Sequence, residues 1–231
     1  LGAISYGLTF ENKPKRIVVT EINDERIERA REVISEKEAA DNGIELIYVN
    51  TAKMDDPIRG LMDITEGHGY DDVFVYIPSK AVCEMGNQIM AYDGCMNLFA
   101  GPTDPKFSAE VNLYDCHYSR SKILGSTGGT IDDMKEAIDK NNAGLINSAV
   151  MITHVGGLDS VVETTKDLPN VPGGKKLIYT HIDMPMTAIE DFGKLGEMDP
   201  FFKELDEVCK ANKGLWSAKA EKMLLEHFGQ E

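Results

Sequence analysis

Residues 16–49 read RIVVTEINDERIERAREVISEKEAADNGIELIYV, and the alternation inside this stretch decides the fold. The run 16–21 is continuous and rich in β-branched side chains, which is typical of a strand buried on both faces of a parallel sheet. A charged helix over about 25–40 follows a capping Asn-Asp pair and stops before an Asn-Gly pair. The run 44–49 predicts a second strand, so the stretch forms one strand–helix–strand unit.

The same alternation continues to about residue 101. We expect a helix over 57–66, a strand over 73–77, a helix over 81–92 and a strand over 95–101. Connections of this length join parallel strands, and the connecting helices cover the faces of the sheet. The pattern therefore predicts an α/β fold with a doubly wound parallel sheet of the Rossmann type.

After residue 101 the rhythm changes. The alternating residues of 109–118 predict an extended segment, and 122–125 predicts a short strand. Residues 126–130 form a glycine-rich turn that opens a helix over 131–140.

The C-terminal part of the sequence combines strands with an acidic, helical end. Strands over 150–154 and 176–180 flank a helix over 158–166, and the chain becomes helical from Pro185 onward. We therefore expect three parts: a Rossmann domain over 1–149, a short return segment over 150–185 and a helical C-terminal tail over 186–231.

Composition excludes several classes of protein. The chain has 231 residues, 42% of them hydrophobic, which is ordinary for a folded protein with a sizeable core. Its 39 acidic and 24 basic side chains give a formal net charge of −15. A field of that sign repels nucleic acid and anionic lipid, so we expect no nucleic-acid partner. No stretch approaches 18 uninterrupted apolar residues, so we expect no membrane partner.

The four cysteines, Cys83, Cys95, Cys116 and Cys209, are widely spaced and form no Cys-x-x-Cys pair. This spacing favours reduced thiols in a cytoplasmic protein over a disulfide framework or a zinc site. Cys116 adjoins His117, but neighbours on a strand point to opposite faces. We therefore expect a cytoplasmic location and no metal site within this sequence.

The sequence begins LGAISYGL, without an initiator Met. These residues have the spacing of a helix interior, and a chain seldom starts inside such a segment. We therefore expect that a further segment precedes Leu1.

Glu21 is a candidate ligand for a nucleotide. In a doubly wound sheet, ligands bind beyond the carboxyl ends of the strands, and an acid after the second strand binds the adenosine ribose. Glu21 lies 19 residues after Gly2, close to the spacing expected from a Gly-x-Gly-x-x-Gly turn. An acid there repels a 2′-phosphate and so favours NAD over NADP. The alternative is a solvated acid in a very acidic chain.

The turn Ser126-Thr127-Gly128-Gly129 is a second candidate. Its backbone N–H groups and the start of the following helix can bind an anion. A flexible strand-to-helix turn explains the same residues equally well.

Several stretches of the sequence match one enzyme family. The run 16–30 matches that family's second strand, its acid and the Arg five residues later, and the runs 69–73, 94–101 and 122–126 match its later strands. On these residues the chain resembles the coenzyme-binding half of the zinc-dependent medium-chain alcohol and polyol dehydrogenases, and the resemblance covers nearly all of its length. A subgroup similar to L-sorbose-1-phosphate reductases shares four further motifs, which are GSTGG (125–129), THVGGL (153–158), GKKLIY (174–179) and GLW (214–216).

The resemblance implies that eight residues contact the cofactor. They are Gly2 at the pyrophosphate, Glu21 at the adenosine ribose, Arg26 near the adenine, Ile77 and Pro78 along the cofactor, Gly101 at the nicotinamide, and Ser126 and Thr127 beside its carboxamide. The family's zinc ligands lie in its front half, so zinc is implied only for the parent enzyme and no catalytic residue is named in this sequence. Where many polyol dehydrogenases carry larger residues, this chain has Gly128-Gly129, which leaves room for a phosphorylated substrate.

The resemblance thus implies the NAD-binding part of a zinc-dependent oxidoreductase that acts on a polyol, sugar or sugar phosphate. Two alternatives stay open from the residues alone. A Rossmann-type methyltransferase also places an acid after the second strand, where it binds the ribose of S-adenosylmethionine. A folded part that catalyses nothing by itself fits the sequence too. We also expect a homo-oligomer, joined through edges near Val111–Cys116.

Overall fold

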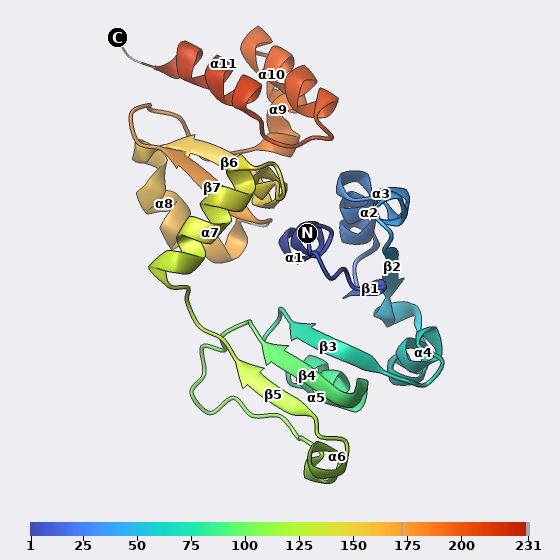
Figure 1. The fold of residues 1–231 in the computed structure, drawn as a ribbon. Helices are drawn as coiled ribbons and strands as arrows, with labels where there is room; N and C mark the ends of the chain where they lie inside the picture. The colour runs from blue at the N-terminus through green and yellow to red at the C-terminus, as the bar shows by residue number, and fades with distance from the viewer. Residues whose placement is uncertain (172, 230–231) are drawn as a thin grey trace. The chain divides into compact units, whose positions relative to one another are not determined.

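The computed structural model describes residues 1–171 and 173–229, which divide into two units (Figure 1). The first unit contains Leu1–Val19, Asp24–Val49 and Ala137–Glu231, and the second contains Thr20–Asn23 and Asn50–Glu136. No helix in the described ranges is long and apolar enough to cross a membrane.

The N-terminal part of the first unit packs short helices against a two-stranded sheet. Its elements are α1 (Gly2–Gly7), β1 (Arg16–Glu21), α2 (Asp24–Val33), α3 (Glu36–Asp41) and β2 (Glu45–Asn50), and β1 pairs with β2. The ends of the two strands, Thr20, Glu21 and Asn50, belong to the second unit. Buried apolar side chains join these elements into one core: Ile4, Ile27, Val33, Ile34, Ala39, Ile44, Leu46, Tyr48, Val150 and Leu215. The predicted strands 16–21 and 44–49 are confirmed.

The helix expected over 25–40 is two helices. Ser35 has an extended backbone, and its hydroxyl accepts a hydrogen bond from the N–H of Glu38 at 3.1 Å. Ser35 is therefore the N-cap of α3, and the chain changes direction there because a capping residue leaves the helical backbone conformation.

The second unit is built on a three-stranded parallel sheet. Its elements are α4 (Pro57–Ile64), β3 (Tyr70–Val75), α5 (Lys80–Gln88), β4 (Met90–Leu98), α6 (Leu113–Tyr118), β5 (Lys122–Gly125) and the start of α7 (Ile131–Asn142). The strand order is β3-β4-β5, and both pairs are parallel. Val75, Cys83 and Met96 form a small buried core between this sheet and α5.

Two details of this unit differ from the sequence prediction. Strand β4 begins at Met90 rather than at residue 95, and α5 ends at Gln88. The pairing of β4 with β3 is irregular between Met90 and Cys95, where Asp93 has a positive φ of 62°. The extended segment expected over 109–118 is wrong, since Leu113–Tyr118 is helical. The Asn112 side chain accepts hydrogen bonds from the N–H groups of Tyr114 and Asp115, and this cap starts the helix.

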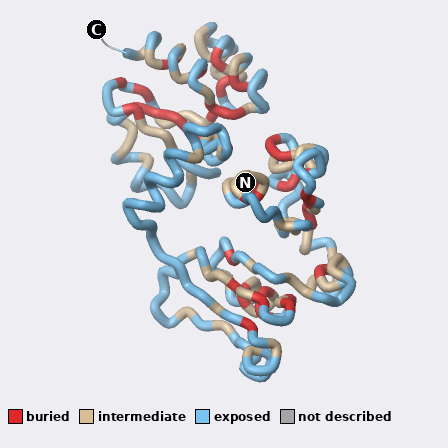
Figure 2. Tube along the Cα trace, viewed as in Figure 1, coloured by how far each residue is buried: buried red, intermediate tan, exposed pale blue. Residues whose placement is uncertain are grey.

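The C-terminal part of the first unit is a second α/β layer. Its elements are β6 (Ile152–Gly157), α8 (Val161–Lys166), β7 (Lys175–Tyr179), β8 (Thr187–Ala188), α9 (Phe192–Leu195), α10 (Pro200–Ala211) and α11 (Ala218–Phe228). The order is β7-β6-β8, with β7 parallel and β8 antiparallel to β6. Figure 2 shows buried positions along β6 and on the tail helices. Short 3-10 turns occupy Thr51–Lys53, Ser148–Met151, Leu158–Ser160, Leu168–Asn170 and Ile189–Asp191.

The parallel ladders and their connecting helices confirm the α/β class and the helical C-terminal tail. The described strands form three sheets rather than one. In a doubly wound sheet of order 3-2-1-4-5-6, the first strand stands between the two halves. Among the described strands, β1 pairs with β2 alone and β3 pairs with β4 alone.

Candidate functional site

The carboxyl ends of β3, β4 and β5 lie in one row. Val75 pairs with Leu98, and Leu98 pairs with Gly125, so the three strands end at the same level. Because the strands are parallel, the segments that follow them leave the sheet at one edge. Ligands of doubly wound sheets bind beyond this edge.

Five of the eight predicted cofactor residues belong to this edge. Ile77 and Pro78 follow β3, Gly101 follows β4, and Ser126 and Thr127 follow β5. All five are exposed. The structure therefore brings together, at one open edge of a single sheet, residues that are up to 50 positions apart in the sequence.

Backbone hydrogen bonds fix how the segments leave this edge. The carbonyl of Val75 accepts from the N–H groups of both Phe99 and Ala100, each at 3.1 Å. The N–H of Ser126 donates to the carbonyl of Leu98 at 3.4 Å, and its hydroxyl donates to Asn97 Oδ1 at 3.1 Å. The hydroxyl oxygen of Ser126 keeps its acceptor capacity at the rim of the sheet.

Three glycines leave the edge open. A Cβ atom placed on Gly101, Gly125 or Gly128 would have no other heavy atom within 4 Å. Gly128 also has a positive φ of 61°, which favours glycine. The rim thus offers space and backbone groups to a ligand, as a dinucleotide site requires.

Sequence reasoning missed an aromatic row beside these residues. The rings of Phe74 and Tyr76 stack with centroids 6.2 Å apart, and those of Tyr76 and Phe99 lie 5.3 Å apart. More than half of each side chain is exposed. The sequence did contain a signal for this row, because an aromatic residue directly follows each of the two strands: Tyr76 follows β3 and Phe99 follows β4.

Glu21 is the last residue of β1 and is half-buried. Its Oε1 atom accepts hydrogen bonds from the N–H groups of Ile22 at 2.8 Å and Asn23 at 3.2 Å. These bonds tie the carboxylate to the two residues that lead into α2. The orientation of the acid therefore depends on where α2 begins.

Gly2 and Arg26 lie in the first unit. Gly2 is the first residue of α1, and a Cβ there would come within 3.2 Å of Met151 Sδ. Close packing against Met151 thus explains this glycine. Arg26 is exposed on the first turns of α2. The cofactor contacts of both residues stay predictions.

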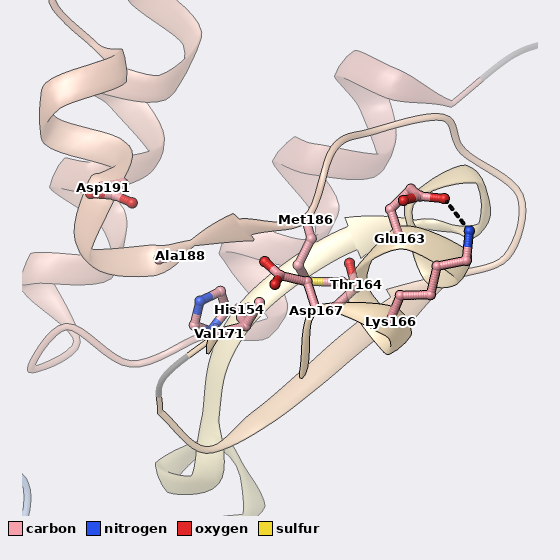
Figure 3. A pocket seen from close by; sticks show the side chains of 9 residues that line it. All are labelled: His154, Glu163, Thr164, Lys166, Asp167, Val171, Met186, Ala188 and Asp191. Atoms are coloured by element: carbon pink, nitrogen blue, oxygen red, sulfur yellow. Dashed lines mark hydrogen bonds and ion pairs between the residues drawn. The ribbon is translucent and has the colours of Figure 1, made fainter. Parts of the chain in front are cut away.

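A hollow of about 630 Å³ lies in the C-terminal part of the first unit (Figure 3). Its lining residues are His154, Glu163, Thr164, Lys166, Asp167, Val171, Met186, Ala188 and Asp191. His154 is buried, and its Nδ1 atom is 2.9 Å from Thr153 Oγ1. Burial and the nearby Lys176 lower the pKa of His154 against the opposing effect of Glu190 and Asp191. None of the predicted cofactor residues lines this hollow.

The described residues contain no group of three or more His, Cys, Asp or Glu side chains that could hold a metal ion. All four cysteines are free thiols. Burial raises the pKa of Cys83, and it raises that of Cys209 to about 11, so both are protonated at neutral pH. Cys83 and Cys209 are buried thiols that belong to no such group among the described residues.

Comparisons of sequence give one family. A sequence model described as zinc-binding dehydrogenase matches residues 11–143. The chain is 46% identical over 228 residues to mannitol-1-phosphate 5-dehydrogenase of Aliivibrio fischeri, which covers 99% of this chain and 54% of that protein. It is 38% identical over 227 residues to L-sorbose 1-phosphate reductase of Klebsiella pneumoniae, which covers 97% and 52%. The chain thus spans about half the length of these relatives.

Comparisons of structure agree on the fold. 2R,3R-butanediol dehydrogenase from Bacillus subtilis matches with a TM-score of 0.57 at 19% identity, over 73% of this chain and 44% of that one. Benzyl alcohol dehydrogenase from Acinetobacter calcoaceticus matches with a TM-score of 0.56 at 16% identity, over 72% and 43%. At this identity the likeness shows the fold alone, and it confirms the Rossmann-like architecture.

Proposed function

Because the chain belongs to the zinc-binding dehydrogenase family, we propose that it forms the NAD-binding part of an oxidoreductase that interconverts a secondary alcohol and a ketone. The observation that carries this proposal is the row of strand ends at Val75, Leu98 and Gly125. This row exposes five of the expected cofactor residues at one edge. The methyltransferase reading has no comparable support.

In this proposal, Glu21 at the end of β1 and the residues at the edge of β3-β4-β5 orient the cofactor. Glu21 accepts hydrogen bonds from the adenosine ribose hydroxyls and repels a 2′-phosphate, so NAD is preferred to NADP. Ile77, whose side chain is 55% exposed, provides apolar contact beside the dinucleotide. The Ser126 hydroxyl oxygen accepts from the nicotinamide carboxamide while its O–H donates to Asn97 Oδ1. NAD supplies a hydride donor or acceptor when it is bound.

We assign no step to zinc on this chain. The described residues hold no suitable set of ligands, so a zinc ion of the whole enzyme needs other residues. What this chain contributes is binding and orientation of the nucleotide.

The substrate that we propose is a polyol, sugar or sugar phosphate. The two relatives named above carry the names of a mannitol 1-phosphate dehydrogenase and an L-sorbose 1-phosphate reductase. The open space at Gly128 supports a substrate larger than a simple alcohol, and an L-sorbose-1-phosphate reductase-like activity is our specific proposal.

We also propose a cytoplasmic homo-oligomer. Four free cysteines favour a reducing compartment. The edge expected near Val111–Cys116 is wrong as a strand, since Leu113–Tyr118 is helical. Among the described strands β5 pairs with β4 alone, and its other edge offers backbone groups to a second copy of the chain.

Calorimetry with two cofactors tests the proposed function. We expect saturable binding of NADH and no heat of binding with S-adenosylmethionine. Binding of S-adenosylmethionine without NADH would contradict the proposal and would favour the methyltransferase. Absence of binding by either compound would also contradict it, since a folded part without a nucleotide site explains that result.

A further inference from the structure

The turn between α10 and α11 reaches α2, although the two segments are more than 170 residues apart in sequence. Arg29 Nη1 donates to the carbonyl of Lys213 at 2.8 Å, and Nη2 donates to the carbonyl of Gly214 at 3.3 Å. In the opposite direction, Lys213 Nζ donates to the carbonyl of Val33 at 3.0 Å and pairs with Glu38 at 3.1 Å. We call these two reciprocal contacts the tail clamp.

The backbone of the turn is shaped for this contact. Lys213 and Gly214 both have positive φ angles, of 56° and 69°. Such a conformation is unfavourable for a residue other than glycine, so surrounding contacts must hold Lys213 in place. A Cβ on Gly214 would lie 3.3 Å from both terminal nitrogens of Arg29. Glycine at this position therefore allows the guanidinium to approach the backbone.

Two neighbouring side chains anchor the turn in two different cores. Leu215 is 5% exposed and belongs to the core that contains Ile27 and Val33 of α2. Trp216 is 3% exposed and belongs to the core of the C-terminal layer, where its Nε1 donates to the hydroxyl of Tyr179 at 2.8 Å. The clamp thus holds α2 against a firmly packed part of the same unit.

Helix α2 links the clamp to the adenosine end of the proposed cofactor site. Lys213 satisfies a carbonyl at the last residue of α2, and Arg29 lies one helical turn after Arg26 on the same face. At its other end, α2 begins after Ile22 and Asn23, whose N–H groups bind the Glu21 carboxylate. A shift of α2 therefore moves the two donors that orient Glu21.

We propose that Arg29 and Lys213 are positioning residues for the adenosine end of the dinucleotide. This inference rests on the proposed NAD-binding function. The C-terminal tail thereby takes part in cofactor binding without touching the cofactor, because it fixes the helix that carries Arg26 and follows Glu21.

The test measures the affinity for ADP-ribose, which carries the adenosine end and lacks the nicotinamide. We expect Arg29→Met to raise the Kd for ADP-ribose about fivefold or more, as is usual for coupling between distant positions. The matched control is Arg31→Met on the same helix, which loses ion pairs to Glu28 and Glu36 and a cation–π contact with Tyr48. Within the described residues, no hydrogen bond or ion pair joins Arg31 to the tail. We expect that control to bind ADP-ribose within about twofold of the wild type.

Two further measurements separate positioning from stability. Arg29→Met also lowers the preference for NADH over NADPH, because the orientation of Glu21 is lost, whereas loss of stability alone does not change this ratio. Lys213→Met keeps the Arg29 bonds to the backbone and gives a second, milder variant should Arg29→Met fail to fold. Lys213→Arg keeps a donor for Val33 and restores binding.

Equal ADP-ribose affinities for folded Arg29→Met, Lys213→Met and Arg31→Met would overturn the inference and leave the proposed function intact. A wild-type protein that binds neither ADP-ribose nor NADH would instead contradict the proposed function itself.

Discussion

Glu21 is the residue on which the proposed cofactor preference depends. Two hydrogen bonds from backbone N–H groups hold its carboxylate at the end of β1. A carboxylate fixed in this way suits a pair of ribose hydroxyls and opposes a phosphate in the same place. We therefore propose that the charge of Glu21, rather than its shape, selects NAD.

Substitution of Glu21→Gln isolates that charge, since the amide oxygen still accepts from Ile22 and Asn23. We expect NADH to bind about tenfold more weakly, because a hydrogen bond to a charged group contributes about 1.5–3 kcal/mol, and we expect NADPH to bind no worse. Fluorescence titration with both cofactors gives the ratio. Glu25→Gln, four residues further on and exposed, is the control. An unchanged ratio in Glu21→Gln would show that Glu21 does not select the cofactor.

At the residue scale, the sequence indicated part of the site. The family resemblance gave Ile77, Gly101 and Ser126, and the structure places each after the end of a strand, while their cofactor contacts stay predictions. Tyr76 and Phe99 were missed, since a ring beside a strand end is indistinguishable from a core aromatic until its exposure is known. The tail clamp was not predictable, because nothing local in the sequence pairs Arg29 with Lys213.

At the scale of elements, capping residues decided where prediction failed. The periodicity of 25–40 is continuous in apolar and charged residues, but Ser35 interrupts the helix by capping α3. Likewise, the alternating residues of 109–118 predict a strand, but the side chain of Asn112 caps a helix, and Leu113–Tyr118 is helical. Hydrophobic spacing is a weak guide over six residues, and a single side-chain cap outweighs it.

Removal of the α3 cap has a measurable effect. We expect Ser35→Ala to lower the free energy of unfolding by about 1 kcal/mol, because the N–H of Glu38 loses its acceptor. Ser79→Ala is a suitable control, since Ser79 precedes α5 without a side-chain capping bond. Urea denaturation compares the two variants. Equal losses of stability would show that the Ser35 hydroxyl does not stabilise α3.

At the scale of the whole molecule, the alternation of strands and helices predicted the α/β class correctly. It did not predict that the described strands form three sheets, because strand order depends on pairing between segments far apart in sequence. The chain spans about half the length of its relatives, and the substrate and the metal are assigned to the whole enzyme only as proposals.

The central claim is that the carboxyl edge of β3-β4-β5 binds NAD. Hydrogen–deuterium exchange with and without saturating NADH tests it most directly. We predict slower exchange in the three segments that leave this edge, 76–80, 99–101 and 126–130, and no change around the hollow at His154. Protection confined to that hollow, or exchange at all three strand ends unaffected by bound NADH, would contradict the account.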